Sequence, residues 1–170
     1  MDSLPTQEQF LSFEEMAKKK GYSPEYVGRK NEYKSVSHIF KAKGKDGKPI
    51  FLRFDLKKAK NLKQNQDWIW IEFKNSEGEN GWIHGDSHFV AFERQKDFVI
   101  VNRSELLSWL SSGKKIRYDL PFVSLAKKAK YRIYKRAGKK DEITQIHFKD
   151  LKKMKSFQVW NKEYAESGQI

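Results

Sequence analysis

The feature that most constrains the fold is an Asp-Gly pair, Asp46-Gly47, between two runs of strand-forming residues. The first run, Tyr33 to Ala42, is rich in β-branched and aromatic residues, and in the second, Pro49 to Leu56, apolar and polar side chains alternate. Asp-Gly between such runs is the strongest short-range signal for a hairpin. We therefore expect an antiparallel strand pair here, in a chain organised around a β-sheet.

Other segments predict more strands and a few helices. Alternation or short apolar runs predict further strands at 67–74, 89–92, 98–101, 131–135 and 143–148. Helical spacing and capping residues predict helices at 7–20, 105–110 and 150–154. This order predicts one α/β or α+β domain over residues 1–170, with a central mixed sheet flanked by helices. We expect residues 1–6 and 162–170 to be loose termini.

Composition narrows the class of protein. The 170 residues include 35 Lys and Arg against 22 Asp and Glu, a net charge of +13, yet 14% of them are aromatic. Disordered basic tails are poor in large apolar groups, so a folded protein is expected. Without cysteine, disulfide-stapled mini-proteins and thiolate zinc sites are excluded. No apolar run approaches the roughly 20 residues of a membrane span. We expect a cytoplasmic protein, monomeric or homodimeric, that does not bind membranes and has a polyanionic partner.

The positive charge is concentrated in the last third of the chain. Residues 1–112 carry 19 basic and 16 acidic residues, whereas residues 113–170 carry 16 and 6. Basic and aromatic residues interleave in 131–136, which offers both phosphate and stacking contacts. The alternative is a Lys-rich surface that only keeps the protein soluble. We expect the 113–160 part of the domain to bind nucleic acid, DNA first and RNA as the alternative. The predicted contacts are Lys127, Lys128, Lys130, Arg132, Lys135, Arg136, Lys139 and Lys140.

Two acid-x-Lys triplets on consecutive predicted strands are the candidate chemistry. They are Asp55-Leu56-Lys57 and Glu72-Phe73-Lys74. Alternation puts each carboxylate and its lysine on one face of its strand. If the strands are neighbours, the four charged groups can share one surface. Carboxylates hold Mg²⁺, which polarises a phosphodiester and acidifies bound water, while a lysine orients that water. The alternative interpretation is a solvated strand face.

The stretch Phe51 to Leu110 resembles the PD-(D/E)XK nuclease superfamily, particularly small phage-type and bacterial nucleases. The similar features are the strand ending in 54–57, the next strand at 68–73, the segments 81–92 and 98–103, the helix at Leu106, and the tail segments 131–136 and 141–144. The resemblance implies an αβββαβ core and Mg²⁺-dependent DNA cleavage, with Mn²⁺ as the alternative metal. It also implies a metal site at the mouth of the hairpin, in a bacterial or phage-infected cell.

Carrying the motif over leaves two alignments open. In the preferred one, Asp55 and Lys57 are central, and Glu72 is an added metal ligand on the neighbouring strand, with Lys74 beside it. Pairing across the turn puts Asp55 opposite about His38, so Ser37 holds the place of the expected first acid. The Leu56 carbonyl is a further candidate ligand. In the other alignment Asp55 is the first acid, and Glu72-Phe73-Lys74 completes the motif.

Three functions follow from these residues. The first is a Mg²⁺-dependent DNA endonuclease, attenuated by Ser37. The second is a non-catalytic nucleic-acid-binding module on a nuclease scaffold. The third is a protein-interaction modulator of a host complex with an acidic surface. The residues that we expect to serve structure rather than chemistry are Glu14, Glu15, Trp68, Trp70, Trp82, His84, Asp86, His88 and Trp109.

Overall fold

The computed structural model describes residues 9–25, 32–63 and 66–165. Its main sheet consists of β1 (Ser23–Pro24), β2 (His38–Lys43), β3 (Pro49–Lys57), β5 (Phe89–Glu93), β6 (Asp97–Asn102) and β8 (Gln158–Asn161). Their order across the sheet is β1-β2-β3-β5-β6-β8, and every neighbouring pair is antiparallel except the parallel pair β3 and β5. This mixed sheet, with few helices, confirms the expected fold class in its α+β form.

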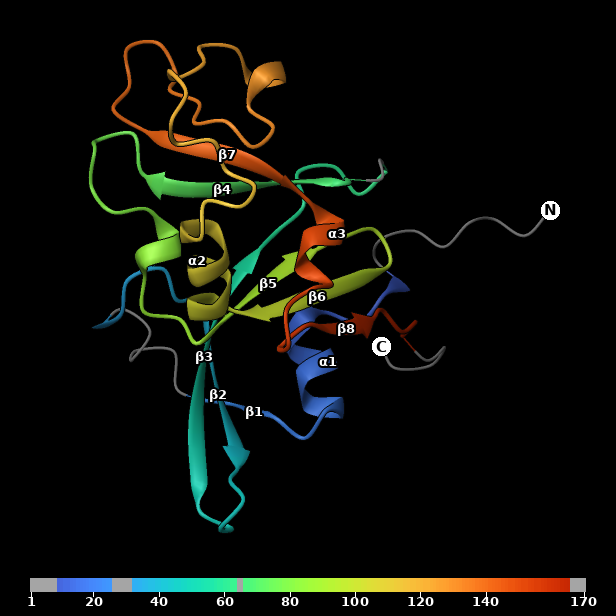
Figure 1. Ribbon diagram of the computed structural model, residues 1–170. Coiled ribbons are helices and arrows are strands. Elements are labelled where there is room, and N and C mark those ends of the chain that lie inside the picture. Colours follow the sequence, from blue (N-terminus) through green and yellow to red (C-terminus); the bar gives the residue numbers. More distant parts are fainter. Residues whose placement is uncertain (1–8, 26–31, 64–65, 166–170) are drawn as a thin grey trace, which may run out of the picture.

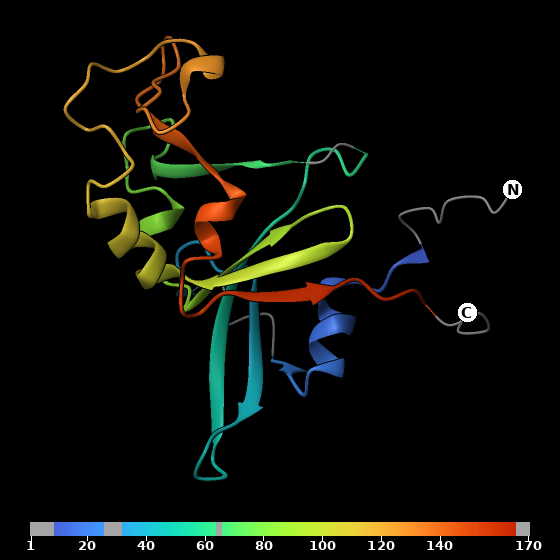
Figure 2. The same ribbon diagram turned by 45° about the vertical axis from the view of Figure 1, so that its right-hand side comes forward.

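The predicted hairpin is present. Strands β2 and β3 pair from Lys43 with Pro49 to His38 with Phe54. Between them Gly47 adopts φ +80°, a left-handed conformation that glycine takes at little cost, and Asp46 accepts a hydrogen bond from Lys48 N–H. The hairpin projects away from the rest of the sheet in both views (Figures 1 and 2).

Two apolar clusters lie on opposite faces of the main sheet. On one face the helix α1 (Phe13–Lys19) buries Phe13, Met16 and Ala17 against Phe40 and the strands around it. On the other face lie α2 (Arg103–Ser111), the 3-10 helix η3 (Trp82–His84) and α3 (Phe148–Leu151). The sheet is therefore covered on both faces, and its central strands are buried.

A second sheet covers the α2 face. It consists of β4 (Trp68–Lys74) and β7 (Glu142–His147), which pair antiparallel. Ile71 and Ile146 are fully buried in the cluster beneath it. Loops of residues 113–141, which include the 3-10 helix η4 (Ala126–Lys128), lie beside this sheet at the end of the molecule opposite the hairpin (Figures 1 and 2). The basic C-terminal segment is thus carried by the small sheet.

Several local expectations need correction. β4 does not lie beside β3, because it leaves the main sheet to pair with β7. The 131–135 segment is not a strand; it meets β7 at the isolated bridge between Tyr134 and Ile143 and through the Tyr131 N–H, which donates to the Gln145 carbonyl. α1 begins at Phe13 because Ser12 caps it through a capping box with Glu15. α2 begins at Arg103 because Asn102, and not Ser104, accepts the capping hydrogen bond.

The expected final helix is also displaced. His147 caps α3, which runs from Phe148 to Leu151 instead of beginning after Asp150. Of the termini, 1–6 and 166–170 lie outside the described residues. In the described part, Lys162 N–H donates to the Lys96 carbonyl and Ala165 N–H to that of Gln9. Among the described residues no helix has the length and apolar character needed to cross a membrane.

Candidate nucleic-acid interface

The first triplet lies at the carboxyl end of β3. Asp55 is buried, and its Oδ2 lies 2.9 Å from Lys57 Nζ. Both side chains are on the face of β3 opposite Phe54, which packs against α1. Burial raises the pKa of the Asp55 carboxyl, and the nearby Lys57 ammonium opposes that rise. The predicted pairing of carboxylate and lysine on one face is therefore present.

Lys57 also borders a groove between the two sheets. Its Nζ lies 4.7 Å from the centre of the Trp82 ring, close enough for a cation–π contact. The groove has a volume of about 450 Å³ and opens where β3 and β5 end. We call it the tryptophan groove, and its aromatic and cationic lining residues are Trp68, Trp70, Trp82, Phe92, Lys57, Lys58, Lys60 and Arg94.

The far wall of the tryptophan groove is formed by the start of β4. The Trp68 ring is held edge-on by Tyr131 and His147, with Lys130 Nζ 4.5 Å from its centre. Tyr131 is fixed in turn, because its hydroxyl donates to Asp150 and accepts from the His147 N–H. Burial, together with the Asp150 carboxylate, raises the pKa of Tyr131 to about 12, so the hydroxyl keeps its proton.

Trp70 is the exposed ring of the groove, with 40% of its surface accessible. Its nearest aromatic neighbour is Tyr134, at 6.0 Å between ring centres and an angle of 41°, which leaves the two rings tilted rather than stacked. Of the structural roles expected for Trp70, packing in the core or on a sheet face, its exposure leaves the sheet face. Trp82 is buried as expected, and Trp68 and Trp109 are half-buried.

The second triplet is not joined to the first. Glu72 lies in the small sheet, on the face of β4 opposite the buried Ile71, and packs against Gly81. Lys74 Nζ lies 3.7 Å from Glu142 on the paired strand β7. The neighbouring-strand arrangement assumed for these residues is therefore wrong.

The predicted metal ligands fit Mg²⁺ poorly in this arrangement. Asp55 contributes one carboxylate, and the ammonium group of Lys57 beside it already compensates its negative charge. Across the described residues no group of three or more His, Cys, Asp and Glu side chains is placed to hold a metal ion. The Leu56 carbonyl belongs to β3, but one carboxylate and one carbonyl do not make a Mg²⁺ site of the usual kind.

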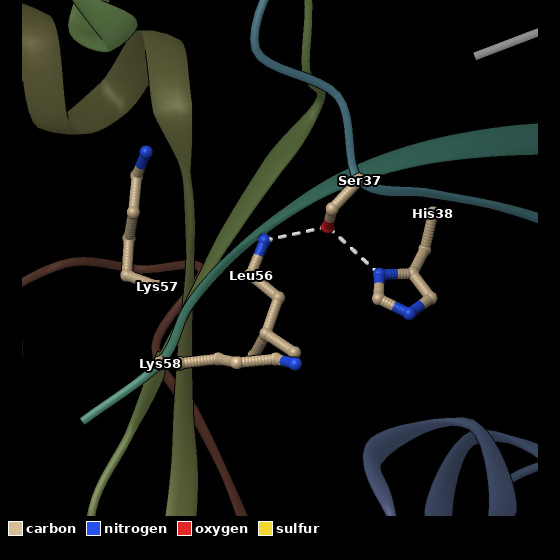
Figure 3. A pocket seen from close by; sticks show the side chains of 5 residues that line it. All are labelled: Ser37, His38, Leu56, Lys57 and Lys58. Atoms are coloured by element: carbon tan, nitrogen blue, oxygen red, sulfur yellow. Dashed lines mark hydrogen bonds between the residues drawn. The ribbon is translucent and has the colours of Figure 1, made fainter. Parts of the chain in front are cut away.

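Ser37, just before β2, lies across from Asp55, the position at which about His38 was expected. Ser37 N–H donates to the Phe54 carbonyl, and Ser37 Oγ accepts from Leu56 N–H at 2.8 Å, so Ser37 lies across from Asp55 in the ladder. Figure 3 shows the Lys57 side chain pointing away from Ser37 and His38. These three residues line, with Leu56 and Lys58, a second pocket of about 540 Å³, which shares Lys57 and Lys58 with the tryptophan groove. Ser37 thus completes the backbone hydrogen bonding of β3.

His38 connects this strand start to α1. Its Nδ1 lies 2.7 Å from Ser37 Oγ and its Nε2 2.5 Å from Glu14 Oε1. Burial alone would raise the pKa of Glu14, but the hydrogen bond and charge of His38 lower it overall. Glu14, expected on the helix surface, is half-exposed and forms this contact between elements.

The predicted phosphate-binding residues divide into two groups. Arg132 and Arg136 hold the loops together: Arg132 Nη2 donates to the Pro121 carbonyl, and Arg136 pairs with the buried Asp141. The other six are exposed in the loops beside the small sheet; of these, Lys130 lies over Trp68 of the tryptophan groove, whereas Lys140 contacts the turn after β4. The six are Lys127, Lys128, Lys130, Lys135, Lys139 and Lys140.

Two of the remaining histidines, His88 and His147, have structural partners. His88 extends the hydrogen bonding at the end of β3, because its Nδ1 accepts from Arg53 N–H. Burial and the charges of Arg53 and Arg103 lower the pKa of His88, which favours the neutral ring. Asp86 accepts from Lys34 N–H. His147 caps α3 by accepting from Lys149 N–H.

Sequence reasoning missed the tryptophan groove. Its signal was present, since Trp68 and Trp70 alternate with apolar residues and therefore face away from the core that Ile69 and Ile71 enter. The sequence does not show that Trp82 and the end of β3 lie opposite Trp68 and Trp70. Comparisons with protein-family models, with curated proteins and with solved structures returned no match.

Proposed function

We propose that the protein binds nucleic acid, DNA in the first place, through the small sheet and the loops of residues 113–141. The observation that carries this proposal is the exposure of six lysines in these loops, one of which, Lys130, lies over Trp68 of a groove that three more lysines border at the end of β3. Such a surface attracts a phosphate backbone and releases its condensed counterions on binding.

The positive charge of these loops is not neutralised by nearby carboxylates. Acidic residues in this region are engaged: Asp141 with Arg136, Asp119 with Arg117, and Glu142 with Lys74. The lysine ammonium groups of the loops therefore outnumber the carboxylates available to neutralise them. An unneutralised cluster repels itself in the free protein, and a polyanion relieves that repulsion.

The test is DNA binding as a function of salt. Lys127, Lys128 and Lys130 are changed together to Gln, and Lys43, Lys45 and Lys48 of the remote hairpin serve as a matched control with the same loss of charge. We expect the first variant to bind oligo-dT more weakly and to lower the slope of log affinity against log salt by roughly 2. Equal effects of the two variants would place the binding elsewhere.

DNA cleavage is the second candidate, favoured by Asp55 and Lys57 on one face of β3 beside the groove. It predicts nicking of plasmid DNA with Mg²⁺ or Mn²⁺ that Asp55→Ala and Lys57→Ala both abolish. Ser37→Asp restores an acid across from Asp55 and is expected to increase nicking. Nicking that persists in both alanine variants would exclude this site, and an inert, folded Ser37→Asp protein would count against the motif alignment.

A further inference from the structure

We infer that the tryptophan groove binds single-stranded DNA, with one base stacked on Trp70. The inference rests on the proposed DNA binding and adds the form of the ligand. Trp70 has an accessible ring, and the tilted Tyr134 does not cover it. What distinguishes Trp70 from other exposed aromatics is its place in a groove that lysines border, where its ring offers a stacking face to a base.

The cations of the groove lie where phosphates would follow a stacked base. Lys130 Nζ is 4.5 Å from the ring centre of Trp68, two residues before Trp70 on the same face of β4. Lys57 Nζ lies over Trp82 on the opposite wall. A nucleotide combines a flat base with an adjacent charged phosphate, and alternating rings and ammonium groups match that pattern.

The ligand form follows from the rings and the size of the groove. In a duplex each base is covered on both faces by its neighbours, so a protein ring can stack only on an unpaired base. The groove volume of about 450 Å³ is in the range of sites for small ligands, which suits a nucleotide unit and not a double helix. Trp68 is locked by Tyr131 and His147, so this wall is ordered before the strand binds.

The experiment compares oligo-dT with a duplex of equal length, using fluorescence anisotropy and quenching of tryptophan emission. Trp70→Ala is expected to weaken oligo-dT binding about five- to 150-fold, while Trp70→Phe, which keeps a ring, stays close to the parent. Duplex binding should change little with either. Oligo-dT should quench tryptophan emission less in Trp70→Phe than in the parent.

Phe51→Ala provides the matched control, because Phe51 is also an exposed aromatic, 42% accessible, and lies on the remote hairpin. The midpoint temperatures of thermal unfolding of Phe51→Ala and of Trp70→Ala should both stay near that of the parent. If Trp70→Ala binds oligo-dT like the parent while the triple lysine variant does not, the groove inference fails and the proposed function stands. A parent that binds neither DNA even at low salt overturns both. If Trp70→Ala loses as much affinity for the duplex as for oligo-dT, only the inference that the groove binds single strands is overturned.

Discussion

At the scale of single residues, the buried charges are the most informative. Asp55 is buried on a strand where alternation alone predicts only which face it occupies. Burial disfavours its ionised form, and Lys57 Nζ at 2.9 Å offsets part of that cost. Asp119 shows the opposite case, since its hydrogen bonds with Arg117 hold its pKa at about 2 on an exposed loop. The same residue type is thus driven in opposite directions by its surroundings.

We expect Asp55→Asn to stabilise the protein at neutral pH. Because the folded-state pKa of Asp55 is raised, its contribution to stability is fully present below the unfolded-state pKa of about 3.9 and is lost as pH rises through the folded-state value. An amide does not ionise, so Asp55→Asn should gain roughly 1 kcal/mol in the free energy of unfolding at pH 7. The gain should shrink toward pH 3 in urea titrations.

Asp119→Asn is the control of opposite sign. The lowered pKa of Asp119 means that its contribution is present above the unfolded-state pKa and is lost as pH falls toward 2. Its substitution should reduce stability slightly at pH 7 and have no effect in strong acid. A loss of stability for Asp55→Asn at pH 7 would show that the ion pair with Lys57 outweighs the cost of burial.

At the scale of elements, the turn between β4 and η3 determines how the walls of the tryptophan groove are placed. Gly81 N–H donates to the Phe73 carbonyl, and a Cβ on Gly81 would lie 2.3 Å from the Glu72 carbonyl oxygen. The φ of Gly81 is −76°, so close approach and not backbone conformation requires glycine here. This contact returns the chain against β4 and brings Trp82 beneath Lys57.

Gly81→Ala should therefore displace backbone, not only side chains. We expect a loss of about 1–3 kcal/mol in the free energy of unfolding, as for other overpacked sites, together with weaker oligo-dT binding. Ser76 lies in the exposed turn before Gly81 and already carries a Cβ, so Ser76→Ala should leave the free energy of unfolding unchanged. Denaturant unfolding measures both variants. An unchanged free energy of unfolding in Gly81→Ala would mean that the backbone at the contact between β4 and η3 moves apart at little cost.

At the scale of the whole molecule, the main sheet joins two cores. Phe40 is fully buried on the α1 face, and Ile146 is fully buried under the small sheet on the other face. Strands β5 and β6 contribute side chains to both clusters, since Ala91 and Ile100 face one and Val90 and Val101 the other. Loss of either core removes a covering layer from the same strands.

We therefore expect a single cooperative unfolding transition. Phe40→Ala should lower the free energy of unfolding by about 3–5 kcal/mol and Ile146→Ala by about 2–5 kcal/mol. In each variant, far-ultraviolet circular dichroism and tryptophan fluorescence should give the same midpoint. Two separate transitions in Ile146→Ala, with fluorescence changing first, would show that the small sheet and its loops unfold on their own.

The sequence by itself determined the local features. Asp46-Gly47 determined the hairpin and its register to within a residue, since Asp55 was expected opposite about His38 and lies across from Ser37. The mixed sheet and the basic character of residues 113–160 also followed, because alternation, turn residues and charge can be read from chain neighbours, although 131–135 was wrongly expected to be a strand. The paired placement of Asp55 and Lys57 on one face followed from the period of a strand.

Tertiary structure alone decided which segments face one another. Nothing local distinguishes β4 as a neighbour of β3 from β4 as a partner of β7, since the alternation that predicts the strand does not specify its partner. The choice depends on long-range packing of the small sheet over α2, and it separates Glu72 from Asp55 while it brings Trp68 and Trp70 opposite Trp82. The sequence therefore contained the charges and rings, and the packing between distant strands decided that they form a groove.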